Sequence, residues 1–289
     1  MAISLGGGGS ASQINEVVSL NNGASTVTLA DGRVYLKGGV FETTISNYPD
    51  ATTTQVYEGT SFSVQSQATA PKGIAWDSQY SFFYVINSTN DSVYKYSSTG
   101  VYQGAVFSVA SQESQPTGIV YADGFLWVIG STNDTAYKYS MTGTYQSVSF
   151  SVGSQENNPQ GITWDGTYFW IVGRQNSTVY KYNASGVYQN VSFSVASQSV
   201  YFNDITWDGT YLWVVDSLND KAYKYTTAGV YTGENFSVGN SESAPNGITW
   251  DGSNLWVIGT TNDTAYKYEA AIGIPTDASF GAQNYMRVV

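Results

Sequence analysis

The stretch DITWDGTYLWVVDSLNDKAYKY, residues 204–225, contains three short apolar and aromatic runs separated by turn residues. Asp208 and Gly209 divide the first two runs, and this pair readily adopts the positive φ angles of a tight hairpin. Asn219 and Asp220 divide the second run from the third. The stretch is therefore predicted to form three antiparallel strands joined by two turns.

The same pattern occurs five times, and successive copies lie 43 to 45 residues apart. The aromatic residue that ends the first run recurs at Trp76, Tyr121, Trp164, Trp207 and Trp250. A fourth run, ending in FSV, recurs with Phe62, Phe107, Phe150, Phe193 and Phe236. A repeat of about 40–45 residues that holds four strands is typical of a β-propeller blade.

The order of the runs predicts how the ring closes. The chain enters the pattern on a fourth strand, residues 56–64, and leaves it after a third strand that ends at Tyr268. The first strand then completes the last blade, which removes both free sheet edges. The predicted fold is all-β, a five-bladed β-propeller of four-stranded blades closed by an N-terminal strand. An open β-solenoid is the alternative, although it would need polar capping repeats that are not evident.

Three domains follow from this assignment. Residues 55–268 are predicted to form the propeller. Residues 1–54 are predicted to form an N-terminal anchor region, with a small β element and a linker. Residues 269–289 are a C-terminal extension, and a closed ring brings it close to the N-terminal region.

Composition excludes several classes of function. The chain of 289 residues carries a net charge of −11 and has neither Cys nor His. The negative charge argues against nucleic acid as a partner, and no run approaches the roughly 18 apolar residues that membrane insertion requires. Imidazole and thiolate sites are impossible, and no spacing matches a dense calcium loop. We therefore predict no metal site and no cofactor.

Most acidic residues belong to the repeat. The aspartates of the first hairpin are interpreted as turn formers: Asp77, Asp165, Asp208 and Asp251. The joint between the second and third strands shares a face with the connections between blades. That joint carries Asp91, Asp134, Asp220 and Asp263, and the connections carry Glu113, Glu156 and Glu242, so one face is predicted to be acidic. A solvated surface and a face that binds Ca²⁺ or sugars are both compatible with this pattern.

Departures from the repeat are the better candidates for a ligand site, because a shared structural need does not explain them. The third unit introduces Arg174, where it reads GRQNST in place of GSTNDT. The fourth unit brings the tentative ligand-binding residues Tyr201, Phe202, Asp204, Asp216 and Lys221. An Arg, two aromatic rings and a carboxylate side by side suit a carbohydrate or an acidic glycan, whereas drift without function is the alternative.

Two carboxylates alone suffice for glycoside hydrolysis. Here nearly every acid belongs to the repeat or to a turn, so no catalytic residue is named. The sequence therefore predicts that the chain is not an enzyme, and glycoside hydrolase is kept as an alternative.

The termini resemble a known class of proteins. MAISLGGGGSASQINEVVSL (1–20), TVTLADGRVYLKGGVFE (26–42) and the ending YMRVV (285–289) are similar to tail and other virion proteins of tailed phages of aquatic bacteria. The resemblance implies a virion location, with residues 1–54 and 269–289 binding other virion proteins and the chain present in several copies or as a homo-oligomer. The repeat also resembles five-bladed lectin propellers of the tachylectin type, at the level of architecture.

The expected function is that of a virion structural protein of the tail or tail fibre, whose propeller attaches to a host-surface receptor or glycan. Decoration of the head or tail without a ligand is the alternative.

Overall fold

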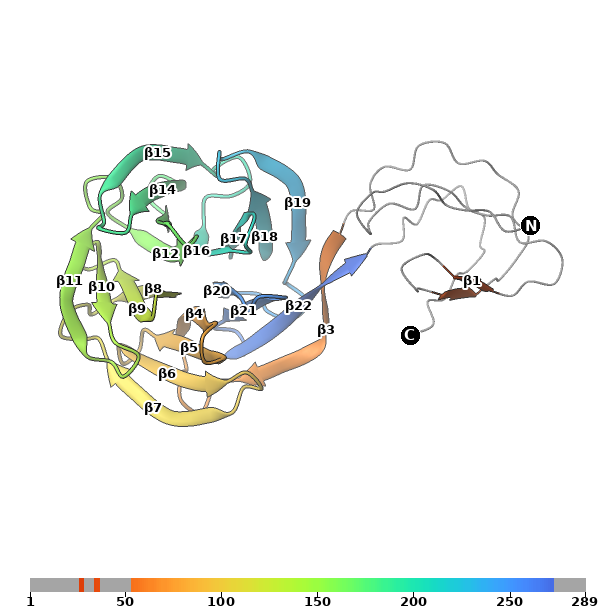
Figure 1. Cartoon of the computed structure of the whole chain (residues 1–289), viewed down its shortest axis with the longest axis horizontal. Helices are drawn as coiled ribbons and strands as arrows, with labels where there is room; N and C mark the ends of the chain where they lie inside the picture. Colours follow the sequence, from red (N-terminus) through yellow and green to blue (C-terminus); the bar gives the residue numbers. More distant parts are fainter. Residues whose placement is uncertain (1–25, 29–33, 37–52, 273–289) are drawn as a thin grey trace. The chain divides into compact units, whose positions relative to one another are not determined.

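The computed structural model describes residues 26–28, 34–36 and 53–272. In these ranges the chain is all-β, and five four-stranded antiparallel sheets surround a common centre (Figure 1). Residues 55–270 form one compact unit. The predicted five-bladed propeller of four-stranded blades is thereby confirmed.

The blades follow one another along the chain, and each begins with its innermost strand. Blade 1 consists of β4 (Pro71–Asp77), β5 (Phe82–Asn87), β6 (Ser92–Ser97) and β7 (Tyr102–Ser108). Blade 2 consists of β8 (Pro116–Ala122), β9 (Phe125–Gly130), β10 (Thr135–Tyr139) and β11 (Tyr145–Ser151). Blade 3 consists of β12 (Pro159–Trp164), β13 (Tyr168–Gly173), β14 (Thr178–Asn183) and β15 (Tyr188–Ser194).

Blade 4 consists of β16 (Phe202–Trp207), β17 (Leu212–Asp216), β18 (Lys221–Tyr225) and β19 (Tyr231–Ser237). Blade 5 joins the two ends of the pattern: β20 (Pro245–Trp250), β21 (Leu255–Gly259), β22 (Thr264–Ile272) and the early strand β3 (Thr53–Ser63). This pairing confirms that an N-terminal strand closes the ring.

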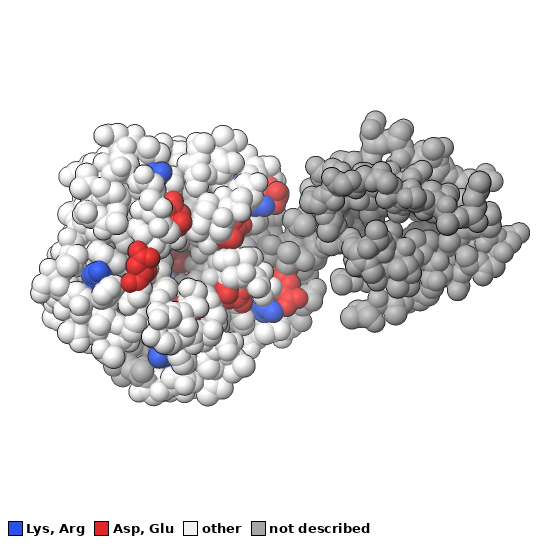
Figure 2. Space-filling view, viewed as in Figure 1, with Lys and Arg blue, Asp and Glu red and all other residues white. Residues whose placement is uncertain are grey.

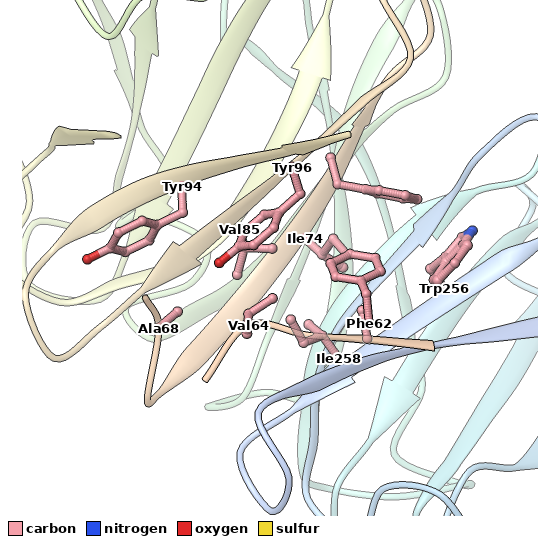
Figure 3. Close-up of a cluster of buried hydrophobic side chains, with 11 residues drawn as sticks. Phe62, Val64, Ala68, Ile74, Val85, Tyr94, Tyr96, Trp256 and Ile258 are labelled. Atoms are coloured by element: carbon pink, nitrogen blue, oxygen red, sulfur yellow. The ribbon is translucent and has the colours of Figure 1, made fainter. Parts of the chain in front are cut away.

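The closing strand also contributes to the core between blades 5 and 1. The ring of Phe62 lies 5.3 Å from the ring of Phe83 and 5.5 Å from that of Trp256. Figure 3 shows Phe62 of β3, and Val64 directly after this strand, among buried side chains from both blades. Burying one such side chain contributes about 1.5–3 kcal/mol, so the loss of β3 removes a substantial part of this interface.

The other blades pack in the same way, through aromatic and β-branched residues on facing sheets. Between blades 2 and 3, for example, the rings of Trp127 and Phe169 lie 5.0 Å apart. The residue that follows each outermost strand is buried against the next blade: Val64, Val109, Val152, Val195 and Val238. The core is therefore a series of interfaces between neighbouring blades rather than one central cluster.

Outside the propeller, β1 (Thr26–Thr28) pairs with β2 (Val34–Leu36) in an antiparallel arrangement. The predicted anchor region 1–54 and the extension 269–289 otherwise lie almost entirely outside the described residues, so both stay predictions. No helix in the described ranges is long and apolar enough to cross a membrane.

Candidate functional site

The aspartates of the first hairpin in each blade stabilise turns. The Oδ1 atom of Asp165 accepts hydrogen bonds from the backbone N–H groups of Thr167 and Tyr168, at 2.9 and 2.7 Å. Its Oδ2 atom accepts the indole N–H of Trp170 at 2.7 Å. Asp208 and Asp251 make the same contacts in blades 4 and 5. The interpretation of these residues as turn formers is confirmed.

The glutamates between blades are buried, so they do not themselves contribute to an exposed acidic face. Glu113, Glu156 and Glu242 are at most 1% exposed. The carboxylate of Glu113 accepts backbone N–H groups from its own loop and from the turn after β9, for example Gln115 N at 2.9 Å and Thr132 N at 3.2 Å. Backbone N–H groups in buried loops need acceptors, and these carboxylates supply them.

Charged side chains on the visible face are spread among the blades. Figure 2 shows several acidic side chains near the middle of that face, and acidic and basic side chains next to each other at its right-hand edge. Among the residues that the structure describes, no three acidic side chains come together in a way that would hold a metal ion.

Blade 4 also has a carboxylate that accepts the N–H groups of this loop. It comes from the end of the second strand instead of from the connection between blades. Ser199 stands where Glu113 and Glu156 stand in their blades, and Asp216 replaces the glycine that ends the second strand. A Cβ atom on that glycine in blade 3, Gly173, would lie 2.1 Å from Glu156, so a glutamate demands glycine opposite. In blade 4 the Asp216 carboxylate accepts Leu218 N and Asn219 N, both at 2.9 Å, and the Ser199 hydroxyl.

Two of the sequence candidates are consequently inside the protein. Asp216 is fully buried and holds the loop after β17. Phe202 is also fully buried, with its ring 6.1 Å from that of Tyr223. Lys221 is the register partner of Asp216 but makes no ion pair within the described part of the chain. These three side chains do not gather into one surface site.

Asp204 lies between the innermost strands. Its Oδ2 atom accepts the N–H of Ile248 in β20 at 2.9 Å, and its Oδ1 atom accepts the N–H of Ile205 at 2.9 Å. Complete burial raises the pKa of this carboxyl well above its ordinary value, and backbone N–H groups, that of Ile248 first, oppose the shift. The other four innermost strands carry glycine here, and their backbones approach closely: Gly73, Gly118, Gly161 and Gly247.

A polar cluster forms where the chain enters the innermost strands. Each of these strands has a β-bulge at its second residue: Lys72, Thr117, Gln160, Asn203 and Asn246. Bulges re-aim side chains and are frequent near functional sites. Three of these residues, with two from adjacent loops, make up what we call the entry cluster: Lys72, Arg174, Tyr201, Asn203 and Asn246.

Hydrogen bonds connect the entry cluster across four blades. The Lys72 ammonium donates to Asn246 Oδ1 at 3.4 Å. Asn203 Nδ2 donates to the carbonyl of Pro245 at 2.7 Å and lies 3.5 Å from Asn246 Oδ1. Arg174 Nη2 in turn donates to Asn203 Oδ1. Lysine and arginine are therefore joined through two amide side chains.

An exposed aromatic ring accompanies the arginine. The guanidinium carbon of Arg174 lies 5.6 Å from the ring centre of Tyr201, whose side chain is 47% exposed. Planar guanidinium groups pack favourably against aromatic faces. Arg174 and Tyr201, both sequence candidates, are thus brought together in the structure.

Within the described residues, neither cation of the entry cluster has a carboxylate partner. The ion pairs in the described ranges are Lys224 with Glu234 and Lys267 with Glu269. Burial lowers the pKa of Lys72, and the charge of Arg174 lowers it further. Burial also lowers the pKa of Arg174, opposed by Tyr201 and Asp216. The cluster therefore favours negative charge.

Sequence reasoning identified Arg174 and Tyr201 but missed Lys72, Asn203 and Asn246. One signal was present: among the second residues of the five innermost strands, Lys72 is the one with a charge. The bulges at Lys72, Asn203 and Asn246 have no marker of their own in the sequence. The contact of these five side chains therefore depends on the tertiary structure and is not predictable from the sequence.

No protein-family model and no curated protein matches the chain. Its structure is similar to that of a glutaminyl cyclase from Myxococcus xanthus, at 11% identity over 76% of this chain and 98% of that one, with a TM-score of 0.56. It is also similar to virginiamycin B lyase from Staphylococcus aureus, at 19% identity over 85% and 80% of the two chains, with a TM-score of 0.46. At such identities these similarities show the fold alone.

The expectation that the chain is not an enzyme is overturned by the similarity to the glutaminyl cyclase. The glutaminyl cyclase is an enzyme with a similar fold. The expectation rested on the acids being repeated or in turns, yet Asp204 is an unrepeated carboxyl among the innermost strands. The similarity assigns no activity to this chain. The argument that excluded an enzymatic activity, however, no longer holds.

Proposed function

We propose that the protein is a virion component of a tailed phage, of the tail or tail fibre, and that its propeller attaches to a glycan on the host surface at the entry cluster. The observation that supports binding is the contact between Arg174 and the exposed ring of Tyr201. Both residues interrupt the repeat, so the packing that all blades share does not account for them.

The chemistry of the entry cluster suits carbohydrate. Sugars are recognised by an aromatic ring that covers their C–H face and by amide and charged groups that bind their oxygens. Tyr201 supplies the ring, and Arg174 supplies several donors. Asn203 and Asn246 are largely buried and hold the two cations in position.

The virion part of the proposal rests on the resemblance of the termini. Residues 1–54 and 269–289 would bind other virion proteins and leave the propeller facing outward. Several copies on one particle add weak individual contacts through avidity, so a shallow surface site is sufficient.

The attachment role is tested with the full chain on arrays of surface polysaccharides from aquatic bacteria and on the cells themselves. The variant Tyr201→Ala is expected to lower binding by about 10-fold or more, because it removes the ring that packs on the sugar. Tyr80→Ala is the matched control, since Tyr80 is a 60% exposed tyrosine in the first hairpin turn of blade 1.

Three other outcomes are distinguishable in the same samples. Binding to no glycan and no cell would favour decoration of the head or tail. Equal loss in both tyrosine variants would show that the entry cluster is not the site. Release of reducing sugar from a bound polysaccharide would show glycoside hydrolysis.

A further inference from the structure

The entry cluster places two cations near each other, and no carboxylate of the described residues pairs with either. Lys72 comes from β4 in blade 1, and Arg174 directly follows β13 in blade 3. Both are half-buried, and the hydrogen-bonded amides of Asn203 and Asn246 connect them. Like charges in a partly desolvated place raise each other's free energy, so such an arrangement stabilises the fold little.

A buried nitrogen atom of this pair has no acceptor among the residues that the structure describes. The Nε atom of Arg174 is buried and has no hydrogen-bond partner, although its Nη2 atom donates to Asn203. Buried donors are normally paired, and an unpaired one requires an explanation. Arg174 as a whole is half-buried, so other atoms of its side chain reach the surface, where a ligand can contact them.

The nearby carboxylates are occupied elsewhere. Asp216 accepts Ser199 and two backbone N–H groups of its own loop. Asp204 accepts the N–H groups of Ile205 and Ile248 between the innermost strands. Neither carboxylate lies within ion-pair distance of Lys72 or Arg174 in the described ranges. The positive charge is therefore available to a ligand.

We infer that Lys72 and Arg174 together bind a carboxylate of an acidic carbohydrate, such as a uronic acid, while Tyr201 packs against the adjoining sugar ring. The inference rests on the proposed function and adds the charge of the ligand to it. Charge-assisted hydrogen bonds to a carboxylate are stronger than neutral ones, and the guanidinium geometry matches two oxygens. The entry cluster thereby selects acidic over neutral glycans.

Binding of defined probes to the full chain tests this inference by calorimetry. The acidic probes are oligogalacturonate, oligomannuronate and oligosialic acid; the methyl ester of oligogalacturonate keeps the sugar and removes the charge. Polyglutamate supplies carboxylates without sugar. We expect at least one acidic oligosaccharide to bind, and its affinity to fall as salt rises.

The variants Lys72→Met and Arg174→Gln each remove one charge and keep the approximate length of the side chain. Each is expected to weaken binding of the acidic probe by about 10-fold, to the level of a neutral ester. Lys138→Gln is the control, because it removes the same charge where the lysine lies 3.6 Å from the ring centre of Phe125. Thermal unfolding checks that all three variants fold.

Several outcomes overturn the inference. These are no binding of any acidic probe at millimolar concentration, equal affinity for the acid and its methyl ester, equal loss with Lys138→Gln, or tighter binding of polyglutamate than of the sugars. Binding of neutral glycans that Tyr201→Ala abolishes would overturn the inference and leave the attachment role intact. Binding of acidic probes without attachment to any host cell would instead contradict the attachment role.

Discussion

At the scale of single residues, the repeat separates architectural acids from unusual ones. Asp165, Asp208 and Asp251 each bind two turn N–H groups and one tryptophan indole, so the same carboxylate recurs for the same reason. Asp204 has no counterpart, since the other blades carry glycine at that place. Its carboxyl group is held by backbone N–H groups in a dry environment, which links the stability of the ring to pH.

The first prediction concerns the titration of Asp204. Because burial raises its pKa in the folded state, its contribution to stability is present below the unfolded pKa and is lost as pH rises through the folded pKa. Asp204→Asn cannot titrate. Its free energy of unfolding should therefore rise relative to wild type above about pH 4, by up to about 1.4 kcal/mol per pH unit.

Urea unfolding of both proteins between pH 4 and pH 8 measures this difference. The exposed turn residue Asp123, changed to Asn, is the control for removing one carboxylate. A difference between Asp204→Asn and wild type that does not change with pH would contradict the prediction. The same trend in both variants would assign it to overall charge rather than to Asp204.

At the scale of elements, the backbone N–H groups around the connections between blades are bound by a side chain from one of two positions. Blades 2, 3 and 5 place a glutamate in the connection and a glycine at the end of the second strand. Blade 4 reverses the arrangement with Ser199 and Asp216, and blade 1 does so with Ala68 and Asn87. Asp216 accepts the N–H groups of the turn after the second strand, whereas Asn87 accepts the N–H of Ala70 in the connection.

The second prediction is that the two forms can be exchanged. Asp216→Gly leaves the N–H groups of Leu218 and Asn219 without their acceptor, which costs about 1–3 kcal/mol for each group. Ser199→Glu alone presses a second carboxylate against Asp216. The double variant restores the form of the other blades, so its free energy of unfolding should exceed that of either single variant.

A double-mutant cycle from urea unfolding gives the coupling between the two positions. Strong favourable coupling is expected, because each residue is compatible with only one partner. If the two losses simply add, Asp216 and Ser199 do not form the exchangeable pair described above.

At the scale of the whole molecule, the ring depends on pairing between the two ends of the pattern. β3 lies beside β22 in blade 5 and contributes Phe62 to the interface with blade 1. The chain must therefore bring residues about 200 positions apart together before the last interface forms, as the hydrogen bond from Val64 N to Asp263 O illustrates. Closure of this kind links all blades into one unit.

The third prediction concerns this closure. A chain without residues 1–63 lacks β3, exposes the edge of β22 and loses the contacts of Phe62, so it should lose more than about 3 kcal/mol of stability. A chain without residues 1–52 keeps β3 and is the control. Thermal unfolding with light scattering compares them, and equal melting temperatures would show that closure by β3 contributes little.

Much of the fold was predictable because the same pattern of strands and turns occurs five times in the sequence. The turn residues and the alternation of apolar and polar residues predicted the strands, because both depend on local chemistry. The length of the repeat and the strand on which it begins predicted the blades and the closing strand. The candidate site was harder to predict. Arg174 and Tyr201 were visible as interruptions of the repeat, whereas Phe202 and Asp216, which are interruptions too, are buried and serve packing and loop capping.

The sequence by itself thus determined the five blades, the closing strand and the role of the hairpin aspartates. Only the tertiary structure decided which unusual side chains meet. Lys72 and Arg174 lie about 100 residues apart and are connected through bulges in the innermost strands. A bulge changes the side of the strand on which a residue projects, and contact between side chains of different blades requires the whole ring. The direction of these side chains and their contacts therefore cannot be predicted from the sequence of one repeat.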